Sequence, residues 1–368
     1  MDIHGFCDEK FARVRETFEA HFKAGKEIGA SFCATVEGET VVDLWGGFAD
    51  EEQTTPWQED TIVSLWSTTK GASSLVVLLL ADRGEIDLSK PVADYWPEFA
   101  QSGKEAILVR QVLNHTSGVA GFDQPVSMDD MCSHEHMANM IATLAPLWDD
   151  RSKTGYHSYT QGYILSEIVR RVRRKSLGVV FAEEIANPLN AEFFIGVPPE
   201  VDSRVSLLIP PTGEAKPDIN EYVTDKDTLG YRVLSNPGLD IDWVTTEAWR
   251  RAEIPSANGH GNARGLANYM RIIALGGTVE GKRILSGQTV ELMHKDPVGG
   301  IDLVSGAPVN WGLGFMVNPD NPGLVFSGGH GGSVAVANTL KRTTCGYAMN
   351  RVVHMEDDRG FNLLASFD

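Results

Sequence analysis

The spacing of apolar residues near the N-terminus changes from helical to extended. Residues 8–25 place apolar side chains among charged ones in a pattern that predicts an amphipathic helix. The stretch that follows, ASFCATVEGETVVDLWGGFAD at residues 30–50, contains two β-rich runs. Its middle, Glu37-Gly38-Glu39, is typical of a hairpin turn, so we expect two paired strands after the helix.

The middle of the chain is dominated by helical spacing. Residues 67–82 switch to a strongly apolar helical pattern, and Pro91 and Pro97 then mark an irregular connection. From about residue 105 to residue 255 we expect mostly helices, as in GYILSEIVRRVRRKSLGVVFAEEIANPL. A further helix of about four turns is predicted over residues 257–277.

Two β-rich runs return near the C-terminus. They cover residues 324–340, LVFSGGHGGSVAVANTL, and residues 345–353, CGYAMNRVV, and a charged turn at Lys341 and Arg342 separates them. Strands are therefore expected at both ends of the chain. The economical topology joins them in one antiparallel sheet with helices packed on its faces.

This order of elements predicts an α/β (α+β) fold with two parts. Residues 1–90 and 256–368 would form an α/β domain that holds the antiparallel sheet and the apolar helix. Residues 91–255 would form an inserted, mainly helical lobe. A cleft between two lobes is a usual place for a small-molecule site, so we expect the residues that carry chemistry to meet there.

Composition narrows the possible partners. The 368 residues carry a formal net charge of −18, which disfavours nucleic acid and anionic membranes, because phosphate binders need a basic surface. The four cysteines form no CxxC pair, so we expect free thiols and neither a zinc ribbon nor a redox motif. The charged N-terminal residues lack a signal peptide's apolar core, and no apolar stretch reaches about 18 residues. We therefore expect a soluble, cytoplasmic protein.

A small polar cluster precedes the apolar helix in residues 64–84, SLWSTTKGASSLVVLLLADRG. Residues three apart share a helix face, so the hydroxyl of Ser67 and the amine of Lys70 can meet. Burial and the positive end of a helix both lower the pKa of a lysine, which can then help to remove the proton of a serine nucleophile. An N–H group of the first turn can also face the oxyanion that forms when Ser67 attacks a carbonyl.

The same residues also fit a structural role. Ser67, Thr68 and Thr69 can cap a helix, which is the commoner meaning of an isolated SxxK. However, the apolar stretch SSLVVLLLA would bury Lys70, and a buried lysine is costly unless the site uses it. No serine has glycine at both −2 and +2, so the nucleophile elbow of α/β-hydrolases is absent. We therefore favour Ser67 as a nucleophile.

SxxK is the first signature of the penicillin-recognising serine enzymes, and the chain resembles that superfamily over nearly its whole length. Residues 61–119 are similar to the family's first block, with its nucleophile helix, the GEIDLSKPV link and the VLNHTSG segment. The branch that the chain most resembles is the class C β-lactamase-like group, which contains the family VIII carboxylesterases. The resemblance implies a β-lactamase/transpeptidase-like fold and a structural role for Asn114, His115 and Thr116.

The second signature of the family is a tyrosine in Y-x-N. The segment GYHSYTQGY at residues 155–163 places Tyr156 at the tyrosine and Ser158 at the asparagine. By resemblance, Tyr156 is a general base that later returns the proton to the leaving group with help from Lys70. A phenol can act as a base near neutrality when neighbouring cations stabilise the phenolate. A packing role for Tyr156 is the alternative.

The third signature, K-T-G followed by a small residue, lies on a strand that borders the site. It is matched by His330, Gly331 and Gly332, with Ser333 next. Glycines let a substrate lie against the strand, and the resemblance makes the N–H of Ser333 an oxyanion donor together with the N–H of Ser67. The alternative is a glycine-rich bend between two strands.

Two departures from the family pattern favour esters over β-lactams. His330 replaces a lysine that helps to hold the drug's carboxylate, and Ser158 replaces an asparagine that contacts its acylamino group. Both changes suit family VIII esterases, so we expect a serine carboxylesterase that hydrolyses short-chain esters through an acyl-enzyme on Ser67. Weak β-lactamase, acyltransferase or D-amino-acid peptidase activity remains open on the same machinery. A non-catalytic ligand-binding protein of this fold is an alternative of another class.

Histidines outside the three motifs could in principle act in catalysis or bind a metal, but we expect them to be structural. His260 begins the helix of residues 257–277 and would cap it or pack against it. His134 and His136 give only a weak metal-ligand spacing, so we predict no metal. The expected partner is a small-molecule ester, with no cofactor.

Overall fold

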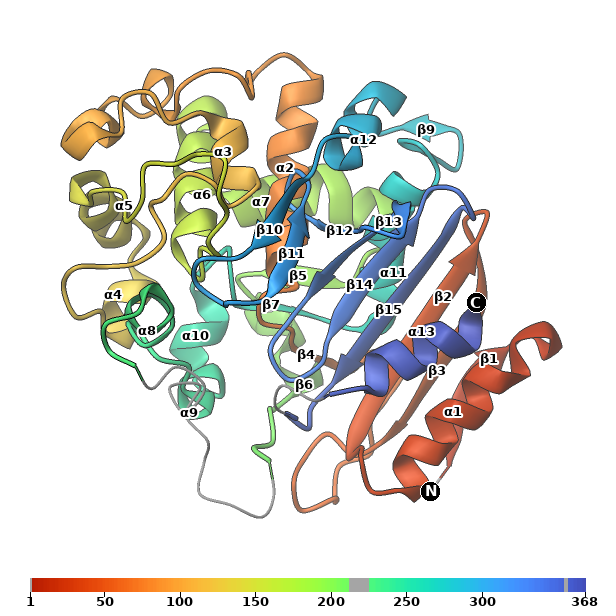
Figure 1. Cartoon of the computed structure of the whole chain (residues 1–368). Coiled ribbons are helices and arrows are strands. Elements are labelled where there is room, and N and C mark those ends of the chain that lie inside the picture. The colour runs from red at the N-terminus through yellow and green to blue at the C-terminus, as the bar shows by residue number, and fades with distance from the viewer. Residues whose placement is uncertain (1, 212–224, 354–356) are drawn as a thin grey trace.

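The centre of the protein is a nine-stranded antiparallel sheet whose strands come from both ends of the chain (Figure 1). The computed structural model describes residues 2–211, 225–353 and 357–368. Across the sheet, the strands are β1 (Ile3–Cys7), β3 (Glu39–Gly47), β2 (Gly29–Val36), β15 (Thr343–Met349), β14 (Val334–Asn338), β13 (Asn321–Gly328), β12 (Met316–Asn318), β11 (Pro308–Trp311) and β10 (Val298–Ile301). The pairing of β2 with β15 joins the N-terminal strands to the C-terminal ones. The predicted antiparallel sheet is confirmed.

The hairpin between β2 and β3 forms where the sequence places it. Glu37 and Gly38 have φ values of 51° and 88°, the left-handed conformation that a two-residue hairpin turn requires. Strand β1, which pairs with β3, was not expected. It is an edge strand with mostly exposed residues, so its sequence carries no alternation of apolar and polar positions.

Helices cover both faces of the sheet, and the alternation of side chains along β2 separates two cores. Phe32 packs in the outer core with Phe18 of α1 (Ala12–Lys23) and Leu363 of α13 (Arg359–Phe367). Cys33, one residue later, packs against α11 (Ala263–Ala274) on the opposite face. Figure 1 shows α1 and α13 side by side in front of the strands, with α11 behind them.

The middle of the chain forms mostly helices, and two short strands of this region join residues 62–64 and 259–261, from outside it, in a second, smaller sheet. The helices are α3 (Val109–Leu113), α4 (Met128–Cys132), α5 (His134–Thr143), α6 (Thr160–Arg173), α7 (Leu177–Phe181), α8 (Leu229–Leu234), α9 (Ile241–Val244) and α10 (Glu247–Arg251). The second sheet has the order β5 (Phe193–Ile195), β7 (Gly259–Gly261), β4 (Ile62–Ser64) and β6 (Val205–Ser206). The remaining elements are α2 (Thr69–Asp82), α12 (Gly287–His294), and the hairpin of β8 (Thr278–Val279) and β9 (Lys282–Arg283). The mainly helical character of this region agrees with the expectation, and the domain boundaries at 90/91 and 255/256 stay a prediction.

One predicted helix is shorter than expected, which changes the place of His260. The segment expected as a helix over 257–277 begins with strand β7, and Asn262 then caps α11 by accepting a hydrogen bond from the N–H of Gly265 at 2.8 Å. His260 is therefore a buried strand residue whose Nδ1 contacts the carbonyl of Asn258, and it does not begin a helix. Within the described residues, no helix has the length and apolar character needed to cross a membrane.

Candidate active site

Ser67 lies in a tight turn between β4 and α2. The helix begins at Thr69 and not at residue 67 as expected, and the N–H of Lys70 closes the turn by donating to the carbonyl of Ser67 at 3.0 Å. The neighbouring Trp66 has a φ of 47°, a strained conformation for a bulky residue. Its buried ring packs edge-on against the ring of His330, with 5.8 Å between centroids. Such strain persists only where the surroundings fix it, and it is frequent at functional sites.

Lys70, one residue into α2, brings its amine to Ser67. The Nζ atom donates to the Oγ of Ser67 at 3.2 Å and to the carbonyls of Ser158 and Ser256 at 2.7 and 2.9 Å. These three oxygens are uncharged, so they compensate little for the loss of hydration. Burial therefore holds the pKa of Lys70 well below its usual value, as expected from the apolar helix.

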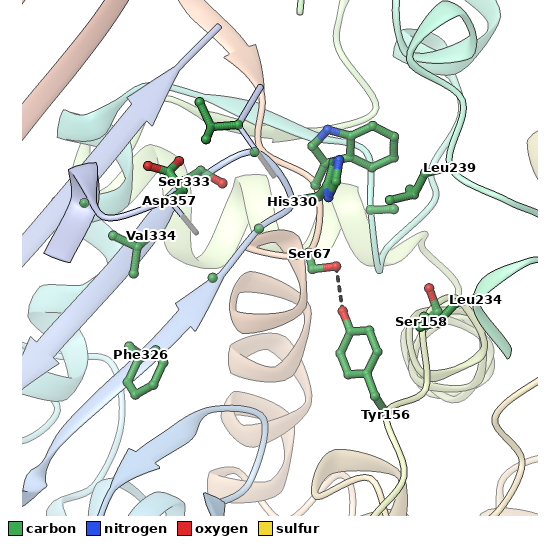
Figure 2. A pocket seen from close by; sticks show the side chains of 18 of the residues that line it. Ser67, Tyr156, Ser158, Leu234, Leu239, Phe326, His330, Ser333, Val334 and Asp357 are labelled. Atoms are coloured by element: carbon green, nitrogen blue, oxygen red, sulfur yellow. Dashed lines mark hydrogen bonds between the residues drawn. The ribbon is translucent and has the colours of Figure 1, made fainter. Parts of the chain in front are cut away.

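Tyr156 reaches the same serine from the helical part of the chain. Its hydroxyl donates to the Oγ of Ser67 at 2.6 Å (Figure 2), and the Nζ of Lys70 lies 4.8 Å from the centre of its ring. Burial raises the pKa of Tyr156 to about 12, so the phenol keeps its proton at neutral pH. The structure thus brings Ser67, Lys70 and Tyr156 together, with a depressed lysine pKa and a raised tyrosine pKa around one hydroxyl.

The position of Tyr156 is set by residues that the sequence did not single out. Its backbone N–H donates to the buried carboxylate of Asp302 at 3.1 Å, and its ring stacks on Trp311 with 6.2 Å between centroids. The ring of His115 also packs against that of Tyr156, with 5.2 Å between centroids, which agrees with a structural role. Asp302 and Trp311 belong to the β10–β11 hairpin, far from Tyr156 along the chain. No local sequence signal could have identified them.

His330, Gly331 and Gly332 do not lie on a strand, which corrects the expectation for the third signature. They form the connection between β13 and β14, the glycine-rich bend of the alternative interpretation. Gly331 and Gly332 have φ values of 87° and 117°, so the backbone conformation itself requires glycine. All three residues nevertheless line the same cavity as Ser67.

The start of β14 is fastened to the turn that carries Ser67. The hydroxyl of Ser333 donates to the carbonyl of Leu65 at 2.9 Å and lies 3.0 Å from the Oγ1 of Thr68. A Cβ on Gly329 would lie 2.1 Å from the same Leu65 carbonyl, so only glycine permits this approach. Ser333 and Ser67 therefore line one cavity, and their role as oxyanion donors stays a prediction.

Two cavities meet at Ser67, and we name them by their walls. The HGG pocket, of about 380 Å³, is lined by His330, Gly331, Gly332, Ser333 and Ser158 among others. The hairpin pocket, of about 340 Å³, is lined by Lys70 and by residues of the β10–β11 hairpin. The residues that line both are Ser67, Tyr156, Phe326 and Gly328. Figure 2 shows the HGG pocket with Leu234 and Leu239 on the helical side and Phe326 on the sheet side.

His134, His136 and the four cysteines were the further candidates for metal or redox chemistry. His134 contacts the carboxylate of Glu167 at 3.0 Å, whereas His136 contacts that of Asp130 at 3.2 Å, so this pair does not converge on one point. Over the described ranges, no three His, Cys, Asp or Glu side chains are grouped as metal ligands would be. The four cysteines are free, as expected.

Comparisons with known proteins identify the family of the chain. The chain matches the Beta-lactamase family over residues 14–366. Esterase/beta-lactamase LipL of Mycobacterium tuberculosis is 33% identical over 374 residues, which cover 98% of this chain and 86% of that protein. Esterase EstB of Burkholderia gladioli is 26% identical over 209 residues, 51% of this chain and 53% of that protein. The chain therefore belongs to the beta-lactamase family.

Solved structures resemble the whole molecule. The crystal structure of a family VIII carboxylesterase has a TM-score of 0.91 at 39% identity and covers 100% of this chain and 99% of that one. A penicillin-binding protein homologue from Caulobacter crescentus has a TM-score of 0.88 at 36% identity, with 100% of both chains covered. The predicted β-lactamase/transpeptidase-like fold is confirmed.

Proposed function

We propose that the protein is a serine carboxylesterase that hydrolyses short-chain esters through an acyl-enzyme on Ser67. The observation that carries the proposal is the convergence of the Tyr156 hydroxyl and the Lys70 amine on the Oγ of Ser67, at 2.6 and 3.2 Å. The similarity to LipL and to a family VIII carboxylesterase supports an ester as the substrate. The two cavities, of about 380 and 340 Å³, suit short substituents on either side of the reacting carbonyl.

The first step is removal of the Ser67 proton. Two N–H bonds of Lys70 are directed at the carbonyls of Ser158 and Ser256, which leaves the third position of its nitrogen facing the Oγ of Ser67. In the neutral amine this position holds the lone pair, which accepts the serine proton as Oγ attacks the ester carbonyl. Burial favours the neutral amine, because it lowers the pKa of Lys70.

The second step is protonation of the departing alcohol. Tyr156 carries a proton and points it at the reaction centre, so it donates to the ester oxygen as the C–O bond breaks. The ammonium of Lys70, which lies over the tyrosine ring, stabilises the phenolate and then returns a proton to it. Lysine and tyrosine thus act as a pair, in which the lysine takes the role of base that was predicted from the sequence for Tyr156, because the raised pKa of Tyr156 keeps the phenol protonated, and the tyrosine acts as acid.

The acyl group is then released by water along the reverse path. Water replaces the alcohol, its proton passes to the same pair and its oxygen bonds to the acyl carbon, and the pair then returns a proton to the Oγ of Ser67 as the bond between Oγ and the acyl carbon breaks. Through both steps the backbone N–H groups of Ser67 and Ser333 would hold the oxyanion, each worth about 3–4 kcal/mol. The hydrogen bonds that tie Ser333 to the turn of Ser67 support this pairing.

The proposal is tested with p-nitrophenyl acetate and butyrate on purified protein. Ser67→Ala abolishes hydrolysis, and Tyr156→Phe lowers kcat/KM by about 10² to 10⁴, because the leaving alcohol loses its proton donor. Tyr163→Phe is the matched control, since that buried hydroxyl donates instead to the carbonyl of Met131 at 2.6 Å. Hydrolysis that survives in Ser67→Ala would contradict the proposal.

A β-lactamase activity on the same machinery is a second candidate, because the relative LipL is named an esterase/beta-lactamase. A β-lactamase of this family uses a lysine to hold the carboxylate of its substrate. The HGG pocket has His330 in that place, and the acidic Asp357 also lines it. We therefore expect nitrocefin to be cleaved with a kcat/KM well below that of p-nitrophenyl butyrate. The cytoplasmic location stays a prediction of the sequence.

A further inference from the structure

We propose that Asp302 positions the proton donor Tyr156 and thereby enables the enzyme to cleave esters of unactivated, aliphatic alcohols, an inference that rests on the proposed function. Asp302 directly follows β10, is fully buried and lines the hairpin pocket, as Lys70 and Tyr156 do. Within the described chain, the hydrogen bonds of its carboxylate come from backbone N–H groups and from the hydroxyl of Ser305. Asp302 is therefore a positioning residue, which acts through Tyr156.

Tyr156 needs support from outside its own segment. It lies between α5 and α6 in a stretch that forms neither helix nor strand, so no regular hydrogen-bond pattern fixes its backbone. The N–H groups of its two neighbours, Gly155 and His157, donate to the carbonyl and the Nδ1 of His115 at 3.0 and 3.1 Å. The N–H of Tyr156 itself donates to Asp302. The tyrosine backbone is thus held by two residues, of which Asp302 belongs to the hairpin pocket.

One oxygen of Asp302 joins the hairpin turn to the tyrosine. Its Oδ1 atom accepts the N–H groups of Val304 and Ser305, at 3.0 and 2.9 Å, within the turn between β10 and β11. The same atom accepts the N–H of Tyr156 at 3.1 Å. Hydrogen bonds to an ionised acceptor are roughly twice as strong as bonds between neutral groups. The carboxylate therefore holds the turn and the tyrosine backbone firmly at one point.

The rest of the hairpin completes this support. The N–H of Leu303 donates to the carbonyl of Thr154 at 2.8 Å, two residues before the tyrosine. The ring of Trp311 stacks on that of Tyr156 at an interplanar angle of 17°. Because Trp311 also pairs with Met316 of β12, the hairpin is part of the central sheet. The direction of the phenol O–H is therefore set from the sheet, and the hydrogen bond to Asp302 is the contact made to the tyrosine backbone itself.

The charge of Asp302 also acts on the proton that Tyr156 donates. Burial is the main cause of the raised pKa of Tyr156, and the negative charge of Asp302 raises it further. In the proposed second step this proton moves to the alcohol oxygen, which keeps the electron pair of the broken C–O bond. An aliphatic alkoxide is a strong base that needs the proton, whereas p-nitrophenolate is a far weaker base and depends on it less. A misplaced phenol therefore harms esters of aliphatic alcohols most.

The test compares two butyrate esters that differ in their leaving group, ethyl butyrate and p-nitrophenyl butyrate, with the released acid titrated at constant pH. In Asp302→Ala, kcat/KM for ethyl butyrate is expected to fall at least about thirtyfold more than kcat/KM for p-nitrophenyl butyrate. A merely destabilised enzyme loses active molecules and lowers both rates by the same factor. The ratio of the two kcat/KM values therefore reports the position of Tyr156 and not the amount of folded protein.

Two further variants separate the hydrogen bond to Tyr156 from the hairpin turn. Asp302→Asn keeps an oxygen for the three N–H groups, and among the described residues Oδ2 has no hydrogen-bond partner to lose, so the ratio should stay within about threefold of the parent's. Asp302→Ser has a side chain one bond shorter, which can still accept an N–H of its own turn but does not extend to Tyr156. It should lower the ratio as Asp302→Ala does, even where the alanine variant does not fold.

Asp50→Ala is the matched control. Asp50 accepts the N–H groups of Thr54 and Thr55 at 2.8 and 2.9 Å, so its substitution removes the same kind of contact. It is absent from the described linings of both pockets. The ratio of the two kcat/KM values in this variant should equal that of the parent.

The inference is overturned if folded Asp302→Ala or Asp302→Ser loses the two activities by the same factor or keeps both, or if Asp302→Asn lowers the ratio as much as they do. Failure of the proposed function has a different result. In that case the parent hydrolyses neither ester, or Ser67→Ala hydrolyses them as well as the parent does.

Discussion

At the scale of single residues, two buried groups, the amine of Lys70 and the phenol of Tyr156, reach the hydroxyl of Ser67. Burial lowers the pKa of Lys70 well below its usual value, which favours the neutral amine, and raises that of Tyr156 to about 12, so the phenol keeps its proton near neutral pH. The spacing of Ser67 and Lys70 in the sequence was enough to predict their contact, although Ser67 lies in the turn before α2 and not in the helix, because the hydrogen bond of that turn also spans three residues. The carbonyls of Ser158 and Ser256, which orient the amine, depend on the approach of distant segments and have no local signal.

The lowered pKa of Lys70 predicts the pH dependence of kcat/KM for a neutral ester. Below that pKa the amine is protonated and has no lone pair for the Ser67 proton, so activity is lost as pH falls and rises to a plateau as pH increases. In Lys70→Arg, whose guanidinium stays protonated, we expect kcat/KM to drop by about 10² to 10⁴ and this rising limb to disappear. Profiles of kcat/KM from pH 5 to 9 measure both effects. If kcat/KM still rises with pH in the same way in Lys70→Arg, the ionisation that produces this rise belongs to another group.

At the scale of elements, a buried arginine of α13 holds the β13–β14 connection that lines the HGG pocket. Arg359, at the start of α13, donates to the carbonyl of Gly331 at 2.9 Å and to the buried carboxylate of Glu27 at 2.7 Å. It also pairs with Asp357. The sequence predicted the glycine-rich segment but not these contacts of Arg359. Arg359 on α13 and Glu27, which lies between α1 and β2, meet only in the folded chain.

Breaking this buried network is expected to be costly. Arg359→Met leaves Glu27 buried without its cation, which predicts a loss of about 3–5 kcal/mol in the free energy of unfolding. Lys341→Met removes an exposed ion pair with Asp368 and is expected to cost no more than about 1 kcal/mol. Urea unfolding followed by tryptophan fluorescence gives both values. Equal losses in the two variants would show that burial does not matter here.

At the scale of the whole molecule, the sequence predicted a sheet built from both chain ends with helices around it. It did not predict β10 to β12, α13 or the edge strand β1. These strands are short, and β10 and β11 include Gly299, Gly300 and Pro308, residues that are rare in strands. They form because neighbouring strands supply hydrogen bonds, and their hairpin then provides the second pocket, which local patterns could not show.

The packing of α13 on the outer face predicts that the C-terminal helix stabilises the sheet. Leu363 is fully buried against the strands, so Leu363→Ala should lower the free energy of unfolding by about 2–5 kcal/mol. Leu340 is 75% exposed, and Leu340→Ala is expected to change it by less than about 0.5 kcal/mol. Leu363 is not part of the site, so kcat/KM of the folded variant should equal that of the parent. A Leu363→Ala protein as stable as the parent would contradict this role of α13.

The most direct test of the account is the mass of the protein during turnover. Acid quenching within milliseconds of mixing with p-nitrophenyl butyrate should give a species heavier by one butyryl group, and peptide mapping should place that group on Ser67. The species should be absent in Ser67→Ala and should form much more slowly in Lys70→Arg. A butyryl group found on another residue, or turnover by Ser67→Ala at the parent's rate, would contradict the claim that Lys70 and Tyr156 activate Ser67.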